Sequence, residues 1–265
     1  MLKKYCLPIA VRIVSFPIFS RIPKKIEDIG AALQSKRGGG FDCEWQEITN
    51  ARHFIRRSNP LIFDIGANHG NWATRMLNSG KTRQCIIMFE PQPSCWPVLK
   101  KLTNDDVRLE TFAASDRCGS LTFYQTGNTE IAGAYPRSDF NNSLEKSEVP
   151  CSTIDKYMEQ NEIEFVDFIK MDIEGHELSA LKGALKSLEQ KKIGAFSFEF
   201  GQANVNSRTF FIDYFNFCSE VGYSLYRVAH DGIPIAVSNY SRSLEYFGGV
   251  ANYIASISPP RRYRK

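Results

Sequence analysis

The sequence lacks the cysteine spacings of a disulfide framework or a zinc site. Its seven cysteines are an odd number, lie scattered along the chain and include no Cys-x-x-Cys pair. This pattern favours reduced thiols in a cytoplasmic protein, and a cysteine among apolar neighbours, such as Cys85, is expected to be a small buried hydrophobe. The chain also has no internal repeat, and its three glycines at 38–40 are interpreted as a hinge.

Acidic residues are missing from both ends of the chain. Residues 1–26 carry six Lys or Arg, and the stretch after Glu245 carries four. Without these ten, 23 basic residues face 29 acidic ones, which gives the body of the chain a net charge of about −6. The formal net charge of +4 therefore belongs to the ends, and nothing indicates a surface that binds nucleic acid.

No apolar stretch near the N-terminus is long enough to span a membrane. Residues 7–19 are apolar and flanked by basic residues, but Pro8, Arg12 and Pro17 interrupt them. A small-residue cleavage site is also missing. We favour a cap packed on the domain, and the alternative is a segment over residues 1–25 that lies on an anionic membrane, at the inner membrane surface.

From residue 60 onward, apolar runs alternate with segments of helical period. This alternation predicts βαβ units in a mostly parallel sheet with helices on both faces. The last two apolar runs, 223–229 and 249–257, have no full helix between them, so one strand is expected to return antiparallel at the sheet's edge. We therefore expect one α/β domain over residues 60–265, preceded by the basic and apolar segment and cap over residues 1–59.

A polar segment interrupts the alternation at residues 126–148. It is rich in Gly, Asn and Ser and follows neither the helical nor the strand period. A connection of this length is uncommon in a compact domain unless it is a lid, a binding loop or disordered. We interpret it as a substrate loop or as a neutral insertion.

The stretch "LIFDIGANHG" has the form of a nucleotide-binding turn at the end of a buried strand. Gly66 and Gly70 permit a tight turn, and the helix that follows offers free N–H groups to a ligand. The dinucleotide-binding pattern is Gly-x-Gly-x-x-Gly, and this chain has Asn68 in place of its middle glycine. This difference argues against NAD or FAD. Asp64 inside the strand end suits a cationic group such as an α-amino group.

Two further carboxylates follow the next strands. Glu90 stands 20 residues after Gly70, where an acidic residue in a nucleotide site accepts hydrogen bonds from both ribose hydroxyls. The alternative is that Glu90 caps the next helix. Asp116 can accept a hydrogen bond from an exocyclic amine such as that of adenine, although a plain turn residue is the simpler interpretation.

The stretch "FIKMDIEGHE" brings reactive groups to the same edge of the sheet. Asp172 ends an apolar strand, and His176 is a candidate general base, or a histidine at the start of a helix. Glu174 and Glu177 are explained by the preference of acids for the first turn of a helix.

Glu199 ends the following strand, and Asn204 comes shortly after it. Asp172, Glu199 and an amide can bind a divalent metal ion through oxygen. We favour the alternative that Glu199 holds a substrate by hydrogen bonds without a metal.

The motifs "DIGANHG", "FEPQP", "AASDRCGSLTFY" and "IKMDIEGHELSALKGA" stand in this order, with "VPCSTIDKYM" between the last two. As a set, the chain resembles the FkbM family of S-adenosylmethionine-dependent methyltransferases, from about residue 60 to residue 253. The resemblance implies a class I methyltransferase fold, a Rossmann-like seven-stranded sheet with a reversed hairpin at one edge. Members commonly O-methylate sugars or other hydroxyl-bearing natural products, which implies a small-molecule or glycan acceptor.

The resemblance also implies which residues line S-adenosylmethionine. They are Asp64, Gly66, Ala67, Asn68 and Gly70 at the methionine part, Glu90 at the ribose, Ser115 and Asp116 at the adenine, and Asp172 at the sulfonium methyl. His176 or Asp172 is the candidate base, and Glu199 holds the acceptor hydroxyl. His69 receives no role.

Two other functions are considered. An NAD-dependent oxidoreductase is disfavoured by Asn68 and by the lack of a Tyr-x-x-x-Lys pair. A non-catalytic protein that binds S-adenosylmethionine is disfavoured by the polar groups at three successive strand ends.

Overall fold

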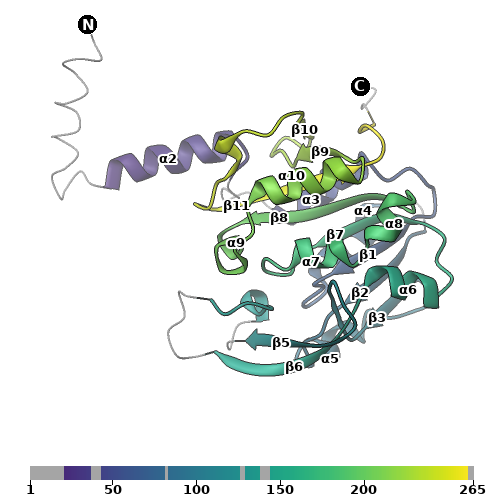
Figure 1. Cartoon of the computed structure of the whole chain (residues 1–265). Helices are drawn as coiled ribbons and strands as arrows, with labels where there is room; N and C mark the ends of the chain where they lie inside the picture. Colours follow the sequence, from purple (N-terminus) through teal and green to yellow (C-terminus); the bar gives the residue numbers. More distant parts are fainter. Residues whose placement is uncertain (1–20, 37–42, 81–82, 126–128, 138–143, 262–265) are drawn as a thin grey trace, which may run out of the picture.

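The computed structural model describes residues 21–36, 43–80, 83–125, 129–137 and 144–261. Within them, one large sheet has the strand order β10-β9-β11-β8-β7-β1-β2-β3 (Figure 1). Its strands are β1 (Leu61–Ile65), β2 (Cys85–Phe89), β3 (Val107–Glu110), β7 (Val166–Met171), β8 (Ile193–Gly201), β9 (Ser224–Arg227), β10 (Ile235–Ala236) and β11 (Val250–Ser256).

Helices cover both faces of this sheet. The helices that follow the N-terminal one are α3 (Cys43–Arg52), α4 (Asn71–Ser79), α5 (Trp96–Leu99), α6 (Ile154–Gln160), α7 (Glu177–Lys182), α8 (Leu185–Glu189), α9 (Gln202–Ser207) and α10 (Phe211–Glu220). The first described helix, α2 (Arg21–Leu33), does not cover the sheet. Phe63 and Ile65 of β1 belong to a core cluster with α6, α7, α8 and α10. Ile62, on the other side of the strand, belongs to a second cluster with α3, α4 and α5. The alternation of strand side chains therefore builds a core on each face.

The register of the central strands sets the position of the polar residues that follow them. Asp64 of β1 lies opposite Met88 of β2 and Lys170 of β7, all three strands being parallel. The carboxyl ends of β1, β2 and β7 consequently meet at one edge, where ligands bind in open α/β sheets.

The predicted α/β fold, a mostly parallel sheet with helices on both faces, is confirmed, with one difference in detail. β11 lies between β8 and β9 and runs antiparallel to both, and β10, at the edge of the sheet, runs antiparallel to β9. The two-residue strand β10 adds an eighth strand beyond β9.

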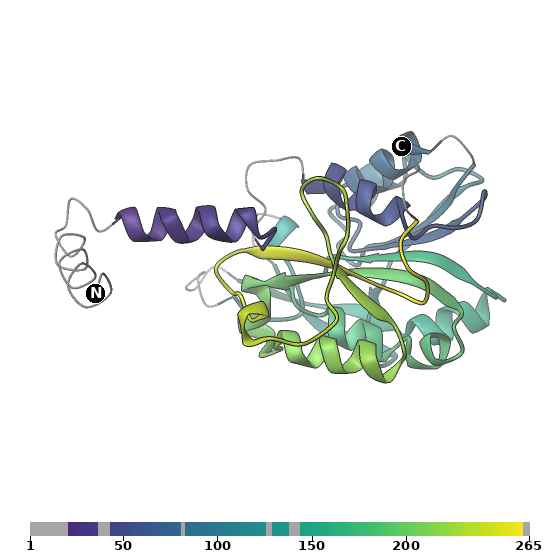
Figure 2. The same ribbon diagram turned by 90° about the horizontal axis from the view of Figure 1, so that it is seen from above.

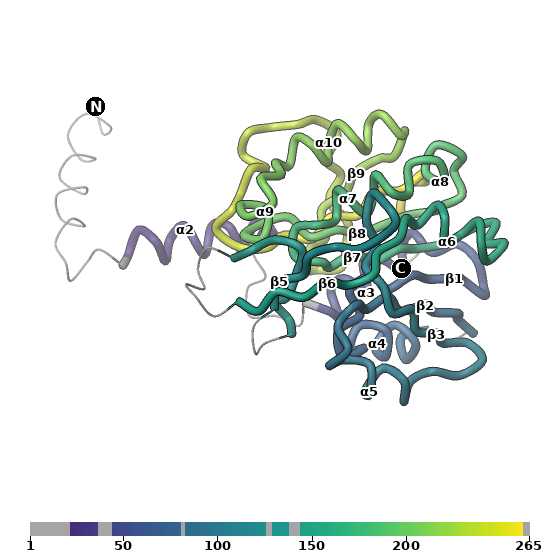
Figure 3. The backbone as a smooth tube through the Cα atoms, turned by 60° about the horizontal axis from the view of Figure 1, so that its bottom comes forward, coloured from purple at the N-terminus to yellow at the C-terminus, as the bar shows by residue number. Residues whose placement is uncertain are grey.

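A second sheet, which the sequence did not predict, follows β3. It consists of β4 (Ala113–Ala114), β5 (Gly119–Gln125) and β6 (Glu145–Ser152), in the order β4-β6-β5. Figure 3 shows β5 and β6 side by side. The segment predicted as a connection over 126–148 is therefore shorter, because residues 145–148 already belong to β6. It also contains the 3-10 helix η1 (Thr129–Ile131), while residues 126–128 and 138–143 lie outside the described residues.

The predicted N-terminal cap contains two helices of different character. α3 packs on the domain, because Ile48 and Ala51 belong to the same core cluster as α4. α2 projects from the body of the molecule (Figure 2). A second 3-10 helix, η2 (Arg242–Leu244), precedes β11. None of the helices in the described part of the chain has the length and apolarity needed to cross a membrane, and residues 1–20 lie outside that part.

Candidate active site

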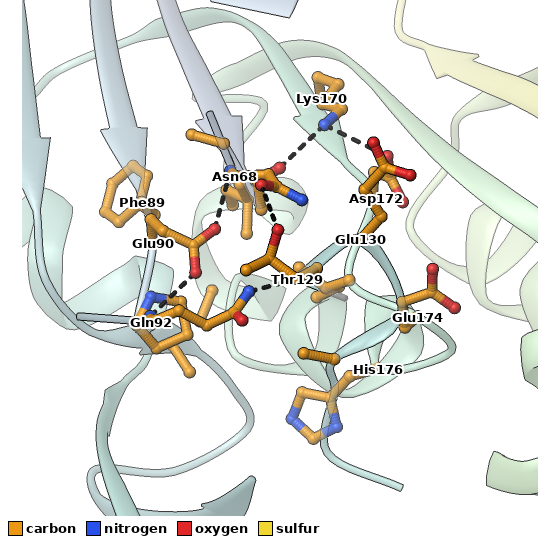
Figure 4. A pocket seen from close by; sticks show the side chains of 18 of the residues that line it. Asn68, Phe89, Glu90, Gln92, Thr129, Glu130, Lys170, Asp172, Glu174 and His176 are labelled. Carbon is orange, nitrogen blue, oxygen red and sulfur yellow. Dashed lines mark hydrogen bonds and ion pairs between the residues drawn. The ribbon is translucent and has the colours of Figure 1, made fainter. Parts of the chain in front are cut away.

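A cavity of about 350 Å³ opens at the carboxyl ends of β1, β2 and β7 (Figure 4). Its volume is in the range of small-molecule sites in proteins. Of the residues predicted to bind a ligand, those that line the cavity are Gly66, Ala67, Asn68, Glu90, Asp172, His176 and Glu199. Asp64, Gly70, Ser115 and Asp116 are not part of its wall.

The two glycines after β1 are required by packing of the chain rather than by a ligand. Gly66 has φ +82°, and a Cβ there would overlap the carbonyl oxygen of Asp172. Gly70 has φ +78°, and a Cβ there would press on the side chain of Leu102. Asn68 has φ +48°, a left-handed conformation that asparagine tolerates better than most residues. Its side chain occupies the place that the dinucleotide pattern leaves bare.

Glu90 is held at the wall by the backbone on either side of it. It is only 2% exposed, and its two carboxylate oxygens accept hydrogen bonds from Asn68 N at 2.8 Å and Gln92 N at 2.9 Å. Burial raises the pKa of Glu90, and these hydrogen bonds oppose that rise. Each oxygen keeps a further lone pair, so the carboxylate can accept two hydroxyl groups of a ligand.

Lys170 is a buried cation at the centre of the site that sequence reasoning missed. Its Nζ lies 3.3 Å from Asp64 Oδ1 and 3.5 Å from Asp172 Oδ2, and it donates a hydrogen bond to Gly66 O at 3.1 Å. Burial by itself lowers the pKa of Lys170, but the carboxylates of Asp64 and Asp172 outweigh burial and raise it. Lys170 therefore remains charged and links Asp64, which is fully buried, to the cavity wall.

Three carboxyl groups from distant parts of the chain surround Lys170 at this end of the cavity, those of Glu47, Asp172 and Glu199. Glu47 comes from α3 and accepts a hydrogen bond from Asn252 Nδ2 at 2.7 Å, while Glu199 lies opposite Asn252 in the sheet. Burial, supported by the carboxylate of Asp172, raises the pKa of Glu47 to about 8. Burial and Asp172 likewise raise the pKa of Glu199. A cationic ligand favours the ionised forms of these carboxyl groups, so this end of the cavity suits a cation.

His176 lies in the wall with both ring nitrogens close to hydroxyl groups. Its Nε2 is 3.0 Å from Ser115 Oγ, and its Nδ1 is 3.3 Å from Tyr135 Oη. Burial lowers the pKa of His176 to about 4, so the imidazole is neutral at pH 7. A neutral imidazole with this low pKa is a weak proton acceptor, and the base role of His176 stays a prediction.

The apolar wall lies where the sequence predicted polar contacts. Asp116 is exposed and pairs with Arg117, whose Nη1 lies 3.4 Å from Asp116 Oδ1. Ala113 and Ala114 line the cavity together with Leu121 from β5. The predicted contacts of Ser115 and Asp116 with adenine stay predictions, and the wall beside them is apolar.

Thr129 of η1 closes the site over the glycine loop. Its Oγ1 lies 3.1 Å from Asn68 Oδ1 and 3.2 Å from His69 Nε2, and its carbonyl accepts a hydrogen bond from Gln92 Nε2 at 3.2 Å. Part of the predicted substrate loop therefore covers the cavity. His69, for which the sequence suggested no role, is one of the contacts that hold it there.

A second, smaller cavity of about 220 Å³ adjoins the first through Glu174 and Glu199, which line both. Its wall includes Arg137, whose Nη1 lies 3.1 Å from Glu174 Oε2, and Gln202 at the start of α9. Among the described residues, no group of three or more His, Cys, Asp or Glu is arranged to hold a metal ion. The suggested metal pair Asp172 and Glu199 thus has no third such ligand there.

A family model and an individual protein both match the sequence of this chain. The family model described as "Methyltransferase FkbM domain" matches residues 64–225. The 2-O-methyltransferase NoeI of Sinorhizobium fredii is 26% identical over 153 residues, which are 52% of this chain and 63% of NoeI. The chain thus matches less than two thirds of the length of this relative.

Solved structures of methyltransferases are also similar. Methyltransferase FkbM from Methylobacillus flagellatus KT is 17% identical with a TM-score of 0.48, covering 76% of this chain and 44% of that chain. A precorrin-6y C5,15-methyltransferase from Geobacter metallireducens is 12% identical with a TM-score of 0.41, covering 81% of this chain and 88% of that chain.

Proposed function

Because the chain belongs to the FkbM family of methyltransferases, we propose that it transfers a methyl group from S-adenosylmethionine to a hydroxyl of a sugar, glycan or glycosylated natural product. The observation that carries the proposal is the division of the larger cavity. The buried carboxylate of Glu90, which can bind a diol, lies at one side of the cavity. The carboxyl groups of Glu47, Asp172 and Glu199, which suit a cation, lie at the other. The 2-O-methyltransferase among the relatives supports a hydroxyl acceptor.

The residues present fit the nucleoside half of S-adenosylmethionine. Glu90 accepts the two ribose hydroxyls, and the adenine lies against the apolar wall formed by Ala113, Ala114 and Leu121. The side-chain oxygen of Gln92 is buried at this end and accepts no hydrogen bond from any described residue. A buried acceptor of this kind is costly unless a ligand supplies a donor, and the exocyclic amine of adenine is such a donor.

The other end of the cavity fits the charged half of the molecule. S-adenosylmethionine supplies a sulfonium methyl, which is electrophilic, and a positively charged α-amino group. Asp172 and Glu47 surround this end, where a bound cation favours the ionised form of Glu47 and is in turn stabilised by both carboxylates in a place that excludes much of the water. Asp64 contributes through Lys170, which it keeps charged and fixed.

The acceptor occupies the smaller cavity, where Glu199 and Glu174 border both spaces. Glu199 orients the acceptor hydroxyl, and Arg137 and Gln202 supply donors for its other oxygens. The main tasks of the protein are to hold this hydroxyl in line at near-attack distance and to remove its proton late. Asp172 is the proposed base, since its side chain is 41% exposed and lies at the junction of the ligands.

Binding is tested by calorimetry and thermal shift with S-adenosylmethionine, S-adenosylhomocysteine and NAD. We expect both adenosyl compounds to raise the melting temperature, because a ligand that binds only the folded state stabilises it. Glu90→Gln should weaken their binding by roughly tenfold or more, since hydrogen bonds to a charged group contribute about 1.5–3 kcal/mol. Glu148→Gln, on the exposed side of β6, is the matched control. A shift with NAD alone would overturn the proposal.

Transfer is tested with radiolabelled S-adenosylmethionine and a panel of sugars and glycans. We expect label in a methyl ether, and a kcat at saturating cofactor that falls in Asp172→Asn by more than the accompanying loss of cofactor affinity. Cofactor binding without transfer to any hydroxyl compound would instead favour the non-catalytic binding protein.

A further inference from the structure

α2 exposes a continuous apolar stripe. Ile22, Ile26, Ile29 and Leu33 are 44%, 65%, 60% and 82% exposed. Their spacing of four, three and four residues puts them on one face of the helix, along about 16 Å of its length. Isolated exposed apolar residues are ordinary, but four in one row on one helix indicate a surface that binds something.

The stripe faces away from the rest of the molecule. Ala31, on the opposite side of the helix, is buried. The C-terminal end of α2 is fastened by His230, whose Nε2 lies 3.0 Å from Ala32 O, and by Lys36, whose Nζ donates to Ser243 O at 2.7 Å. The helix projects beyond the sheet and its helices (Figures 1 and 2). The apolar face is therefore accessible to a large flat partner.

The charges around the stripe indicate the nature of that partner. At about 100° per residue, Lys25 lies about 70° and Arg21 about 110° from the centre of the stripe, whereas Glu27 and Asp28 lie about 130° and Lys24 about 170° from it. A lysine beside an apolar face can bury its stem and keep its ammonium at a polar boundary. The sequence from residue 1 to residue 26 carries six basic residues and no acid.

We propose that α2 binds the surface of a membrane that contains anionic lipid, with its apolar stripe in the headgroup region. α2 has apolar residues on one face and Lys25 beside them, and residues 1–26 are basic without an acid, as is usual for a segment that lies on an anionic membrane. A second copy of the chain fits less well, since four aliphatic side chains per helix bury less than the roughly 1,200 Å² of a stable protein interface. This inference is independent of the proposed methyl transfer.

The experiment is co-sedimentation of the full chain with vesicles of phosphatidylcholine alone and with about 30 mol% phosphatidylglycerol. We expect binding to the anionic vesicles, weakened by added salt, and a loss of roughly tenfold or more in the double variant Ile26→Glu/Ile29→Glu. Ile233→Glu is the matched control, because Ile233 is 62% exposed in a loop outside α2, and it should bind like the unchanged chain.

Two outcomes would overturn the inference. Equal sedimentation of the double variant and the unchanged chain would show that the stripe does not bind lipid. A dimer that is lost in the double variant in sedimentation velocity, without binding to vesicles, would assign the stripe to a second copy of the chain. Circular dichroism of all variants checks that the fold is kept, which is expected because the substituted side chains are exposed.

Discussion

At the scale of the residue, the carboxylates of the site follow from the sequence and the cation does not. Asp64, Glu90 and Asp172 stand at strand ends, where polar residues after apolar runs are visible in the sequence. Lys170 lies inside β7, and the same run also contains the buried Asp167, which accepts a hydrogen bond from Leu61 N. A charged residue within a strand of six buried residues could have indicated a buried ion pair. Its partner depends on the register between β1 and β7.

The ion pair of Lys170 and Asp64 gives a prediction about stability. Lys170→Met removes the cation and leaves the fully buried Asp64 without its opposite charge, which should lower the free energy of unfolding by about 3–5 kcal/mol. The double variant Lys170→Met/Asp64→Asn should be no less stable than Lys170→Met alone, because the unpaired charge is gone. Urea denaturation of the unchanged chain, of Lys170→Met and Asp64→Asn alone and of the double variant measures the coupling between Lys170 and Asp64. Strictly additive losses would contradict the pairing.

At the scale of the element, the order of strands and helices was predictable and the second sheet was not. The alternation of apolar runs and helical segments from residue 60 fixes a mostly parallel sheet. β6 begins with Glu145 and Lys146, which are exposed, and only Val149 and Cys151 of this strand are buried. Such a strand shows little of the apolar alternation that identifies strands in a sequence, and it pairs with β5 across residues 126–144. The contribution of α3 to the cavity is not visible in the sequence either, because it depends on how this helix packs over the sheet.

The contact between η1 and the glycine loop gives a prediction about ligand binding. Thr129→Val removes the hydroxyl that lies near Asn68 and His69, so η1 should be held less firmly over the cavity. The affinity for S-adenosylmethionine should fall about threefold to tenfold, since one hydrogen bond contributes about 1 kcal/mol. Calorimetry measures the change. Thr122→Val, which removes an exposed hydroxyl bonded to Glu148, should leave the affinity unchanged. A Thr129 variant with unaltered affinity would show that η1 does not contribute.

At the scale of the whole molecule, the fold concentrates negative charge that the sequence distributes widely. The body of the chain has an excess of acidic residues, yet nothing in the sequence brings residue 47 beside residue 199. The topology does so, because α3 packs over the face that also carries Lys170 and Glu199. The acidic end of the cavity is thus a property of the tertiary structure, and only its members at strand ends were predictable.

This concentration of charge predicts how stability depends on pH in the absence of ligand. The pKa of Glu47 is raised to about 8, so the folded state holds a proton that the unfolded state releases near pH 4.5. The stabilising contribution of that proton is complete below pH 4.5 and is lost as the pH rises toward 8. The lowered pKa of His176, about 4, acts in the opposite direction, but only between pH 4 and pH 6.5.

Between pH 6.5 and pH 8.5, Glu47 should therefore contribute to a fall in stability that His176 does not offset. Glu47→Gln keeps the size and a hydrogen-bond acceptor for Asn252 but cannot ionise, so its melting temperature should fall less over this range than that of the unchanged chain. Glu220→Gln, on the surface of α10, should behave like the unchanged chain. Scanning calorimetry at the two pH values measures the difference. If Glu47→Gln loses as much stability as the unchanged chain, Glu47 is not protonated in the folded state, and the carboxylates around Lys170 share their charge in another way.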